Sequence, residues 1–351
     1  MVSLLQLAQV TEEGVRFLSP HDKTPMYVLL FQRPLPCRDR HPQPPTPQKE
    51  KQEHKNKTKP LKPPHSLTNP PTNRLLTPEH SISLQNSIGS DIIMQLDDVI
   101  ATTSPDHARI REATHRSIRW LDRCIAAHAN PTTQNLFCIV QGGLDLALRR
   151  ECALEMLKRD TPGIAIGGLS GGEAKEEYCA VVKTCTELFP ERKPRYVMGV
   201  GFPDDLVVSV ALGADMFDCV WPTRTARFGN AVTSKGTLNL RHQQFAEDFG
   251  PVEEGCGCVI CRCREQGGLG ITRAFVFHTA AKETAGAHLL SIHNVHFLLG
   301  LMGRVREAVL RDEFPRFLRG YFGEMYGGVK ERYPAWAVEA LRGVGVDLMV
   351  D

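Results

Sequence analysis

The stretch NLFCIVQGGLDLALRRECALEMLKRDTPGIAIGGLSGG, residues 135–172, contains a complete strand–helix–strand unit and decides the fold class. The apolar runs at 135–143 and 163–172 have the length of buried strands. Residues 144–159 between them place apolar side chains three to four positions apart, as a helix does. A helix that joins two strands in this way indicates parallel strands with the helix outside.

The same alternation extends in both directions along the chain. Further strands are predicted at 91–99, 194–201 and 215–223, and further helices at 113–129, 173–189 and 203–213. Each predicted strand ends in polar or glycine residues, namely Asp97–Asp98, Gln141, Gly167–Gly168, Met198–Gly199 and Asp218. In a (β/α)8 TIM-type barrel such ends converge on one mouth, whereas an open doubly wound sheet gathers only those near its switch point. The pattern therefore favours the barrel.

The barrel is incomplete at the N-terminus, because five βα units are found where eight are needed. Residues 1–23 offer at most a hairpin fragment of it. Twelve of the 24 prolines lie between Thr24 and Leu75, so residues 24–75 are expected to be a disordered Pro-rich insert. We expect barrel units with the active site at 76–250, a zinc-binding subdomain at 251–300 and C-terminal helices at 301–351.

Composition excludes several classes of protein. With 42% hydrophobic residues, 23% charged residues and a net charge of +2, the chain is typical of a soluble globular protein, and its global charge indicates no polyanionic partner. No apolar run approaches the roughly 18 residues of a membrane span, and no secretory signal is recognisable. Eleven cysteines, mostly scattered singly, indicate a reducing compartment rather than a disulfide framework.

The segment CGCVICRC, residues 256–263, predicts a metal site. Cys256, Cys258 and Cys261 form a C-x-C-x₂-C pattern, and four-coordinate zinc with a structural role is the favoured interpretation. An iron–sulfur cluster and ordinary buried thiols are the alternatives. Spacing leaves open whether Cys263 or a histidine (278, 288, 293 or 296) is the fourth ligand.

Asp218 ends a predicted strand and precedes two arginines, Arg224 and Arg227. The carboxylate could act as a nucleophile or acid–base group at the barrel mouth, or it could cap the next helix or pair with Arg224. The arginines could be solvated loop charges or could hold phosphates. Asp97 and Gln141 together suit a flat polar ligand, since they offer both acceptors and donors, or they could only satisfy strand ends.

With these residues in hand, the sequence resembles the tRNA-guanine transglycosylases, and among them the catalytic chains of the eukaryotic queuine tRNA-ribosyltransferases. The motifs that carry the resemblance are GSDIIMQLDDV, RSIRWLDRCIAAH, VQGGLD, AIGGLSGGE, RYVMGVG, MFDCVWPTRTARFGN and the cysteine cluster followed by IHN, in the family's order. The match covers residues 1–23 and about 75–351.

The resemblance implies a reaction and roles for individual residues. Asp218 is expected to attack C1′ of the wobble guanosine, forming a covalent glycosyl ester that queuine then displaces with net retention. The implied substrate-binding residues are Asp97, Gln141, Gly168, Leu169, Gly171 and Met198, with Gly171 leaving room for the cyclopentenediol of queuine. The implied RNA-binding residues are Gly199, Val200, Gly201, Phe202, Pro203, Asp204, Asp205, Thr223, Arg224, Thr225, Ala226 and Arg227. The implied zinc ligands are Cys256, Cys258, Cys261 and His293, which leaves Cys263 spare.

The resemblance also implies partners, and the sequence departs from the family at two places. The expected substrates are the G-U-N anticodon tRNAs for Asp, Asn, His and Tyr, with guanine or queuine as the free base. A heterodimer with the noncatalytic family subunit is implied, in the cytoplasm or at the mitochondrial outer surface.

A D-S-G-G-F-Q motif, whose aspartate is the family's general acid–base group, is missing before Met1, and the Pro-rich insert interrupts the match. A start-site error and a retained intron would explain both. The alternative is a catalytically dead or accessory tRNA-binding subunit, and a weaker one is an unrelated barrel glycosidase.

Overall fold

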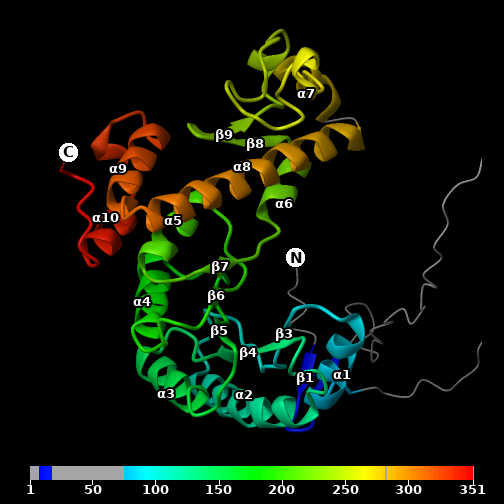
Figure 1. Ribbon diagram of the computed structural model, residues 1–351, viewed down its shortest axis with the longest axis vertical. Coiled ribbons are helices and arrows are strands. Elements are labelled where there is room, and N and C mark those ends of the chain that lie inside the picture. The colour runs from blue at the N-terminus through cyan, green and yellow to red at the C-terminus, as the bar shows by residue number, and fades with distance from the viewer. Residues whose placement is uncertain (1–7, 18–74, 281–282, 351) are drawn as a thin grey trace, which may run out of the picture. The chain divides into compact units, whose positions relative to one another are not determined.

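A computed structural model of the chain describes residues 8–17, 75–280 and 283–350 (Figure 1). The expected insert at 24–75 therefore lies outside the described residues except for its last position. The chain divides into two compact units, Met1–Leu76 and Thr77–Asp351. In the first unit, β1 (Ala8–Val10) and β2 (Val15–Phe17) pair antiparallel. Val15 also exchanges backbone hydrogen bonds of 2.9 and 3.0 Å with Leu76.

The second unit is built on a five-stranded, wholly parallel sheet with strand order β3-β4-β5-β6-β7. Its strands are β3 (Ile92–Met94), β4 (Asn135–Val140), β5 (Gly163–Ile166), β6 (Arg195–Val197) and β7 (Met216–Phe217). The helices that precede and connect them are α1 (Pro78–Ile88), α2 (His107–Ala127), α3 (Leu146–Met156), α4 (Lys175–Thr186) and α5 (Pro203–Ala211). In Figure 1 the connecting helices flank the curled sheet, which makes this unit half of a (β/α)8 barrel and confirms the predicted fold class.

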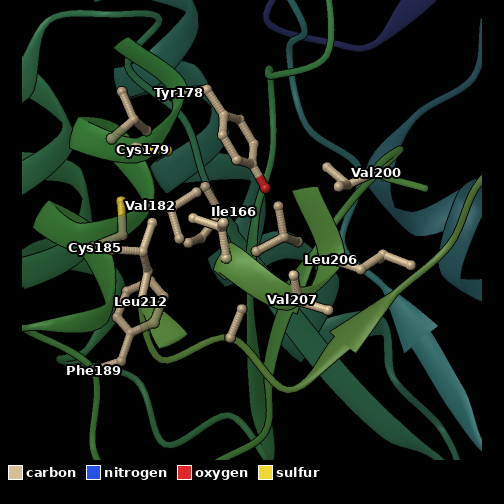
Figure 2. Close-up of a cluster of buried hydrophobic side chains, with 14 of the residues drawn as sticks. Ile166, Tyr178, Cys179, Val182, Cys185, Phe189, Val200, Leu206, Val207 and Leu212 are labelled. Carbon is tan, nitrogen blue, oxygen red and sulfur yellow. The ribbon is translucent and has the colours of Figure 1, made fainter. Parts of the chain in front are cut away.

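The main core lies between the sheet and its helices. Alternate strand residues such as Val140, Ile166 and Val197 are fully buried against this helical layer. Figure 2 shows Ile166 of β5 among Val182 and Cys185 of α4 and Val207 of α5. Each fully buried aliphatic side chain of this kind contributes about 1.5–3 kcal/mol to folding. The core therefore fixes the strands and, with them, the loops that follow each strand.

The last strand is much shorter than the predicted run at 215–223, which was wrong beyond Phe217. After two sheet residues the chain turns into α6 (Trp221–Arg227), with Pro222 in its first turn. Proline is well suited to a helix start, since its fixed φ is helical and no hydrogen-bond donor is needed there. Arg224 and Arg227 consequently lie on a helix and not in a loop.

The chain then forms a smaller packed region around one long helix. Its elements are β8 (Asn230–Thr233), β9 (Gly236–Asn239), η2 (Gln243–Phe245), η3 (Arg264–Gln266), α7 (Arg273–Ala280) and α8 (Thr284–Leu310). Asn294 of α8 is fully buried and donates to the carbonyls of Pro222 and Asn230, both at 3.0 Å, while its own oxygen accepts from Val232 N at 2.8 Å. These bonds join α6, the β8–β9 hairpin and α8.

The chain ends in α9 (Phe314–Met325), η4 (Lys330–Arg332) and α10 (Ala335–Arg342), which pack near α4 and α5 (Figure 1). The expected boundary between residues 300 and 301 lies inside α8. Within the part of the chain that the structure describes, no helix combines the length and apolar composition that crossing a membrane requires.

Candidate active site and metal centre

Asp218 follows β7 directly and its side chain is exposed. Its Oδ1 accepts a hydrogen bond of 2.5 Å from the Tyr196 hydroxyl and one of 3.0 Å from the backbone N–H of Gly199. It does not cap α6, which has no side-chain cap, and no ion pair within the described ranges joins it to Arg224. Both bonds use the same oxygen, so Oδ2 accepts none from any described residue and is available to attack an electrophilic carbon.

Tyr196 is the residue that orients this carboxylate. It lies on β6, pairs with Met216 of β7 and is half-buried. Burial, and then the neighbouring Asp218 carboxylate, raises the pKa of the phenol above its usual range. The hydroxyl therefore keeps its proton and remains a donor to Asp218 at every physiological pH.

A second polar cluster forms at the ends of β3, β4 and β5. Gln141 Nε2 donates to Asp97 Oδ2 at 2.6 Å, and the Gln141 amide lies against the glycine pair 167–168. A Cβ added at Gly167 would lie 2.8 Å from Gln141 Nε2, and one at Gly168 would overlap Gln141 Oε1. Only glycine at both positions lets the amide lie in this place.

Burial raises the pKa of the half-buried Asp97 carboxyl to about 6; the Gln141 hydrogen bond opposes this and the Asp98 charge adds to it. Asp98 has a different environment. It is 1% exposed and its two oxygens accept from Arg109 at 2.7 and 2.8 Å and from Arg116 at 2.6 Å. Asp98 therefore fastens α2 to the sheet, whereas Asp97 has acceptor capacity left for a ligand.

The loop after β5 carries Leu169 and Gly171 past the same cluster. Glu173 holds its turn, with Oε1 accepting from Ser170 N at 2.6 Å and Oε2 from Gly171 N at 2.8 Å. A Cβ added at Gly171 would lie 2.5 Å from Thr102 Oγ1. A side chain at position 171 of this loop would therefore meet Thr102.

The two clusters lie at neighbouring strand ends of one sheet edge. β5, β6 and β7 are adjacent in the sheet. A Cβ added at Gly199, whose N–H binds Asp218, would lie 3.7 Å from the side chain of Ser170 in the loop after Gly168. Met198 precedes Gly199, is half-buried and donates its N–H to Ile166 O at 3.4 Å. The parallel topology therefore brings the residues expected for base binding and for attack to the same edge.

The expected RNA-binding residues separate into exposed and buried groups. On α6, Thr223, Arg224 and Arg227 are exposed, and neither arginine forms an ion pair within the described residues. Thr225 and Ala226 are buried, and Thr225 Oγ1 accepts from Asn230 at 3.1 Å. The exposed positions, three and four residues apart along the helix, form one cationic face.

The segment at residues 199–205, which comprises a loop and the first turn of α5, shows the same separation. Gly199 and Phe202 are exposed, while the positions at 200, 201 and 203 are buried. The Asp204 carboxylate accepts from the hydroxyls of Tyr321 and Tyr326 of α9 at 2.6 and 2.5 Å. Asp205 is 5% exposed and accepts from Lys175 at 2.6 Å. Both aspartate side chains therefore fasten the first turn of α5, Asp204 to α9 and Asp205 to Lys175 of α4.

The cysteine segment and α8 form a metal centre. Ligand atoms of Cys256, Cys258, Cys261 and His293 all lie within 4.8 Å of one another. The three sulfurs lie 3.8, 3.6 and 3.4 Å from His293 Nδ1, as expected for tetrahedral zinc with bonds of about 2.3 Å to sulfur and about 2.0 Å to nitrogen. His293 Nε2 lies 2.9 Å from the carbonyl of Val232, which fixes the ring proton there and leaves Nδ1 to coordinate. Cys263 is exposed and outside this group.

Three residues that shape the site were not predicted, namely Tyr196, Thr102 and Arg149. Tyr196 is the middle residue of β6 and lies two positions before Met198, so the two-residue period of the predicted strand at 194–201 offered a signal for it. Arg149 is fully buried in α3 next to apolar positions, where a helical pattern alone indicates only an interruption of the core. Thr102 lies in a connecting loop and has no local signal.

Comparison with known proteins gives consistent results. The family model described as queuine tRNA-ribosyltransferase matches residues 66–326. The queuine tRNA-ribosyltransferase catalytic subunit of Schizosaccharomyces pombe is 55% identical over 349 residues, which are 99% of this chain and 74% of that protein. The protein of the same name in Caenorhabditis briggsae is 49% identical over 74% of this chain and 63% of its own length. The queuine tRNA-ribosyltransferase of Thermoanaerobacter sp. is 45% identical over 73% of this chain and 66% of its own.

Proposed function

Because this chain belongs to the queuine tRNA-ribosyltransferase family, we propose that it is a tRNA-guanine transglycosylase that exchanges guanine for queuine at the wobble position of G-U-N anticodons. The observation that carries the proposal is the state of Asp218. Tyr196 and Gly199 hold Oδ1, while Oδ2 has no donor among the described residues. A carboxylate fixed through one oxygen, with the other free, is arranged for nucleophilic attack.

The reaction proceeds in two displacements. Asp218 Oδ2 forms a bond to C1′ of the wobble nucleoside as the glycosidic bond breaks, and guanine leaves with the bonding electrons and takes up a proton. The ring nitrogen of queuine then attacks C1′, loses its proton and expels the carboxylate. Two inversions restore the original configuration, as in a retaining glycosidase. The resemblance assigns the proton transfers to an aspartate that the family carries upstream of the segment matching Met1.

The base lies, in this proposal, on the cluster at the ends of β3 to β5. The Asp97 carboxylate accepts from N–H groups of the purine-like base, Gln141 contributes its amide, and Gly168 and Leu169 offer backbone N–H groups. Because the pKa of Asp97 is about 6, the carboxyl is largely ionised at pH 7.5 and serves as an acceptor. Gly171 and Met198 are the remaining residues that the resemblance implies for binding the base.

The tRNA is held by the exposed faces beside Asp218. Arg224 and Arg227 bind phosphates, because guanidiniums match phosphate oxygens in two-point contacts. Phe202 is 51% exposed and offers a ring on which a splayed anticodon base can stack. The wobble nucleotide must leave the base stack before Asp218 can reach its sugar. Contacts to the RNA on both sides of this nucleotide hold it in the unstacked position.

Zinc is the proposed occupant of the metal centre, with a structural role. Cys256, Cys258, Cys261 and His293 would supply four ligands, which is the full set of a structural zinc site and would leave no position for substrate. The ion would tie the cysteine segment to α8. We propose the division into barrel units at 76–250 and a zinc-binding subdomain from 251, with the later boundary moved to the end of α8 at Leu310. The resemblance to the family also supports assembly with a noncatalytic family subunit, in the cytoplasm or at the mitochondrial outer surface.

An accessory, non-catalytic role is not favoured. The candidate nucleophile and the two side chains of the base site are all in place, and relatives at 49–55% identity are named catalytic subunits.

Exchange of radiolabelled guanine into tRNA tests the proposal, with the zinc-loaded full chain and with its Asp218→Asn variant. We expect incorporation by the wild type and a covalent tRNA adduct under denaturing conditions, with both absent from the variant. A tRNA whose G-U-N anticodon is altered should not be labelled. Tight tRNA binding by a folded wild type with neither label nor adduct would refute the proposal.

A further inference from the structure

Arg149 of α3 is a charged side chain that the proposed reaction leaves without a role. It is fully buried, and its guanidinium contacts only backbone carbonyls among the described hydrogen bonds. Nε donates to Gly143 O at 2.8 Å, Nη1 to Val140 O and Gly167 O at 2.8 Å each, and Nη2 to Gly168 O at 3.3 Å. No carboxylate of the described residues pairs with it.

A cation in this position is costly, because its hydration is lost without a counter-ion. Filling the volume alone would need only an apolar side chain. Four carbonyls, one from the last residue of β4 and three from the loops after β4 and β5, instead converge on one rigid planar group, which matches the fork geometry of guanidinium donors. Gly142 permits this approach, since a Cβ there would lie 2.9 Å from Arg149 N. The side chain therefore works as a clamp between the loops after β4 and β5.

These two loops are the ones that carry the base site. Gln141 lies between Val140 and Gly143, whose carbonyls Arg149 holds, and its amide lies against Gly168. Thr102 Oγ1 donates to the same Gly168 carbonyl at 3.2 Å. A substitution of Arg149 thus affects both loops of the base site, the one after β4 and the one after β5.

The carbonyl bonds also fix the direction of two backbone donors. In a trans peptide the N–H points opposite to the carbonyl. With the carbonyls of Gly167 and Gly168 turned toward Arg149, the N–H groups of Gly168 and Leu169 point away from it. Both residues are half-exposed. Neither N–H makes a hydrogen bond within the described residues. They are donors ready for an acceptor on a ligand.

We propose that Arg149 is a positioning residue for base recognition, which presents the N–H groups of Gly168 and Leu169 to an acceptor of the purine-like base and holds Gln141 in register with them. The inference rests on the proposed function and deepens it. Arg149 acts through the backbone and touches neither base nor sugar. Its loss should weaken binding of the free base while leaving tRNA binding unchanged.

Four variants test this inference. Arg149→Met removes all the donors, and Arg149→Lys keeps the charge but reaches fewer carbonyls. Thr102→Val removes a single bond to Gly168 O without disturbing a buried charge. Arg150→Met is the matched control, since Arg150 is the next residue of α3 and is exposed. The KM for guanine, kcat, the Kd for tRNA and the urea midpoint are measured for each.

We expect the KM for guanine to rise roughly tenfold or more in Arg149→Met, less in Arg149→Lys, and up to about tenfold in Thr102→Val, because each lost hydrogen bond misaligns donors to the base. The tRNA Kd should stay within twofold of wild type, and Arg150→Met should match wild type throughout. If Arg149→Met does not fold, Arg149→Lys and Thr102→Val decide the question. A guanine KM within twofold of wild type in those two variants, or a parallel loss of tRNA affinity, would overturn the inference.

Binding of radiolabelled guanine by equilibrium dialysis separates this inference from the proposed function. If the wild type shows no exchange, the proposed function fails, and dialysis still decides the role of Arg149. Weaker guanine binding by folded Arg149→Lys than by wild type supports it. Equal binding, or no binding by the wild type, overturns it.

Discussion

The neighbouring carboxylates Asp97 and Asp98 should respond in opposite ways to the same substitution, aspartate to asparagine. Asp98 is 1% exposed and accepts three guanidinium hydrogen bonds of 2.6 to 2.8 Å from Arg109 and Arg116. Asp97 has one side-chain donor, Gln141, and a pKa that burial raises. Asp98→Asn therefore tests the stability of the fold, and Asp97→Asn tests base binding at the site.

The loss of stability expected for Asp98→Asn depends on the two arginines that remain beside it. Removing one partner of a buried ion pair costs about 3–5 kcal/mol, because the other charge is left uncompensated. The Arg109 and Arg116 side chains are 31% and 12% exposed, and Arg116 keeps Glu112 at 3.0 Å. Water and Glu112 compensate part of the charge that is left on the arginines, so we expect the free energy of unfolding to fall by about 2–3 kcal/mol.

Asp97→Asn should leave stability unchanged or raise it. The folded-state pKa of Asp97 is about 6 against an ordinary 3.8, so the folded chain favours the neutral form. The associated stability is fully present below pH 4 and is lost as pH rises through about 6. At one pKa unit per 1.36 kcal/mol, the variant gains at most about 3 kcal/mol over wild type at pH 8, and the gain disappears toward pH 4. The KM for guanine should nevertheless rise about 10–100-fold, since one or two hydrogen bonds to a charged acceptor are lost.

Urea unfolding is followed by the fluorescence of the three tryptophans, of which Trp120 is fully buried, at about pH 4.5 and about pH 8, on either side of the Asp97 pKa. Guanine exchange at saturating tRNA gives the KM for guanine. Asp98→Asn should retain a guanine KM near wild type per folded molecule. The reasoning is refuted if Asp98→Asn loses base affinity at unchanged stability. It is also refuted if Asp97→Asn destabilises the fold at pH 8 as much as Asp98→Asn does.

Three further outcomes are expected. Arg224→Ala and Arg227→Ala should each reduce the slope of log Kd for tRNA against log salt by about 1, with guanine KM unchanged, as titration by filter binding will show; an unaltered slope contradicts a phosphate contact. Chelation of zinc, or His293→Ala, should lower the melting temperature in calorimetry, and re-addition of Zn²⁺ should restore it only in the wild type. Tyr196→Phe should lower kcat roughly tenfold or more without changing tRNA Kd, because Asp218 loses the donor that orients it; single-turnover adduct formation at the wild-type rate would exclude that role.

Local sequence was sufficient for the architecture. Alternating apolar runs and helical periods predicted every strand of the sheet and the helices α2 to α5, because each pattern is set by burial of one face of its own element. Parallel pairing then required the strand ends to share one edge, so the polar and glycine residues at these ends, among them Asp97, Gln141, Gly168 and Asp218, could be named as candidates from their positions. Their individual roles were implied only by the resemblance to the family. The C-x-C-x₂-C spacing likewise predicted a metal centre by itself.

The tertiary structure decided which neighbour each of these residues has. His293, which is 32 to 37 residues away from the three cysteines in sequence, joins the metal centre in place of Cys263 because α8 packs against the cysteine segment. The Asp204 carboxylate is held by tyrosines 117 and 122 residues away. Contacts of that kind depend on how separate elements pack, and no local period records them. The same holds for Arg149, whose buried charge makes sense only after the loops following β4 and β5 have been brought together around it.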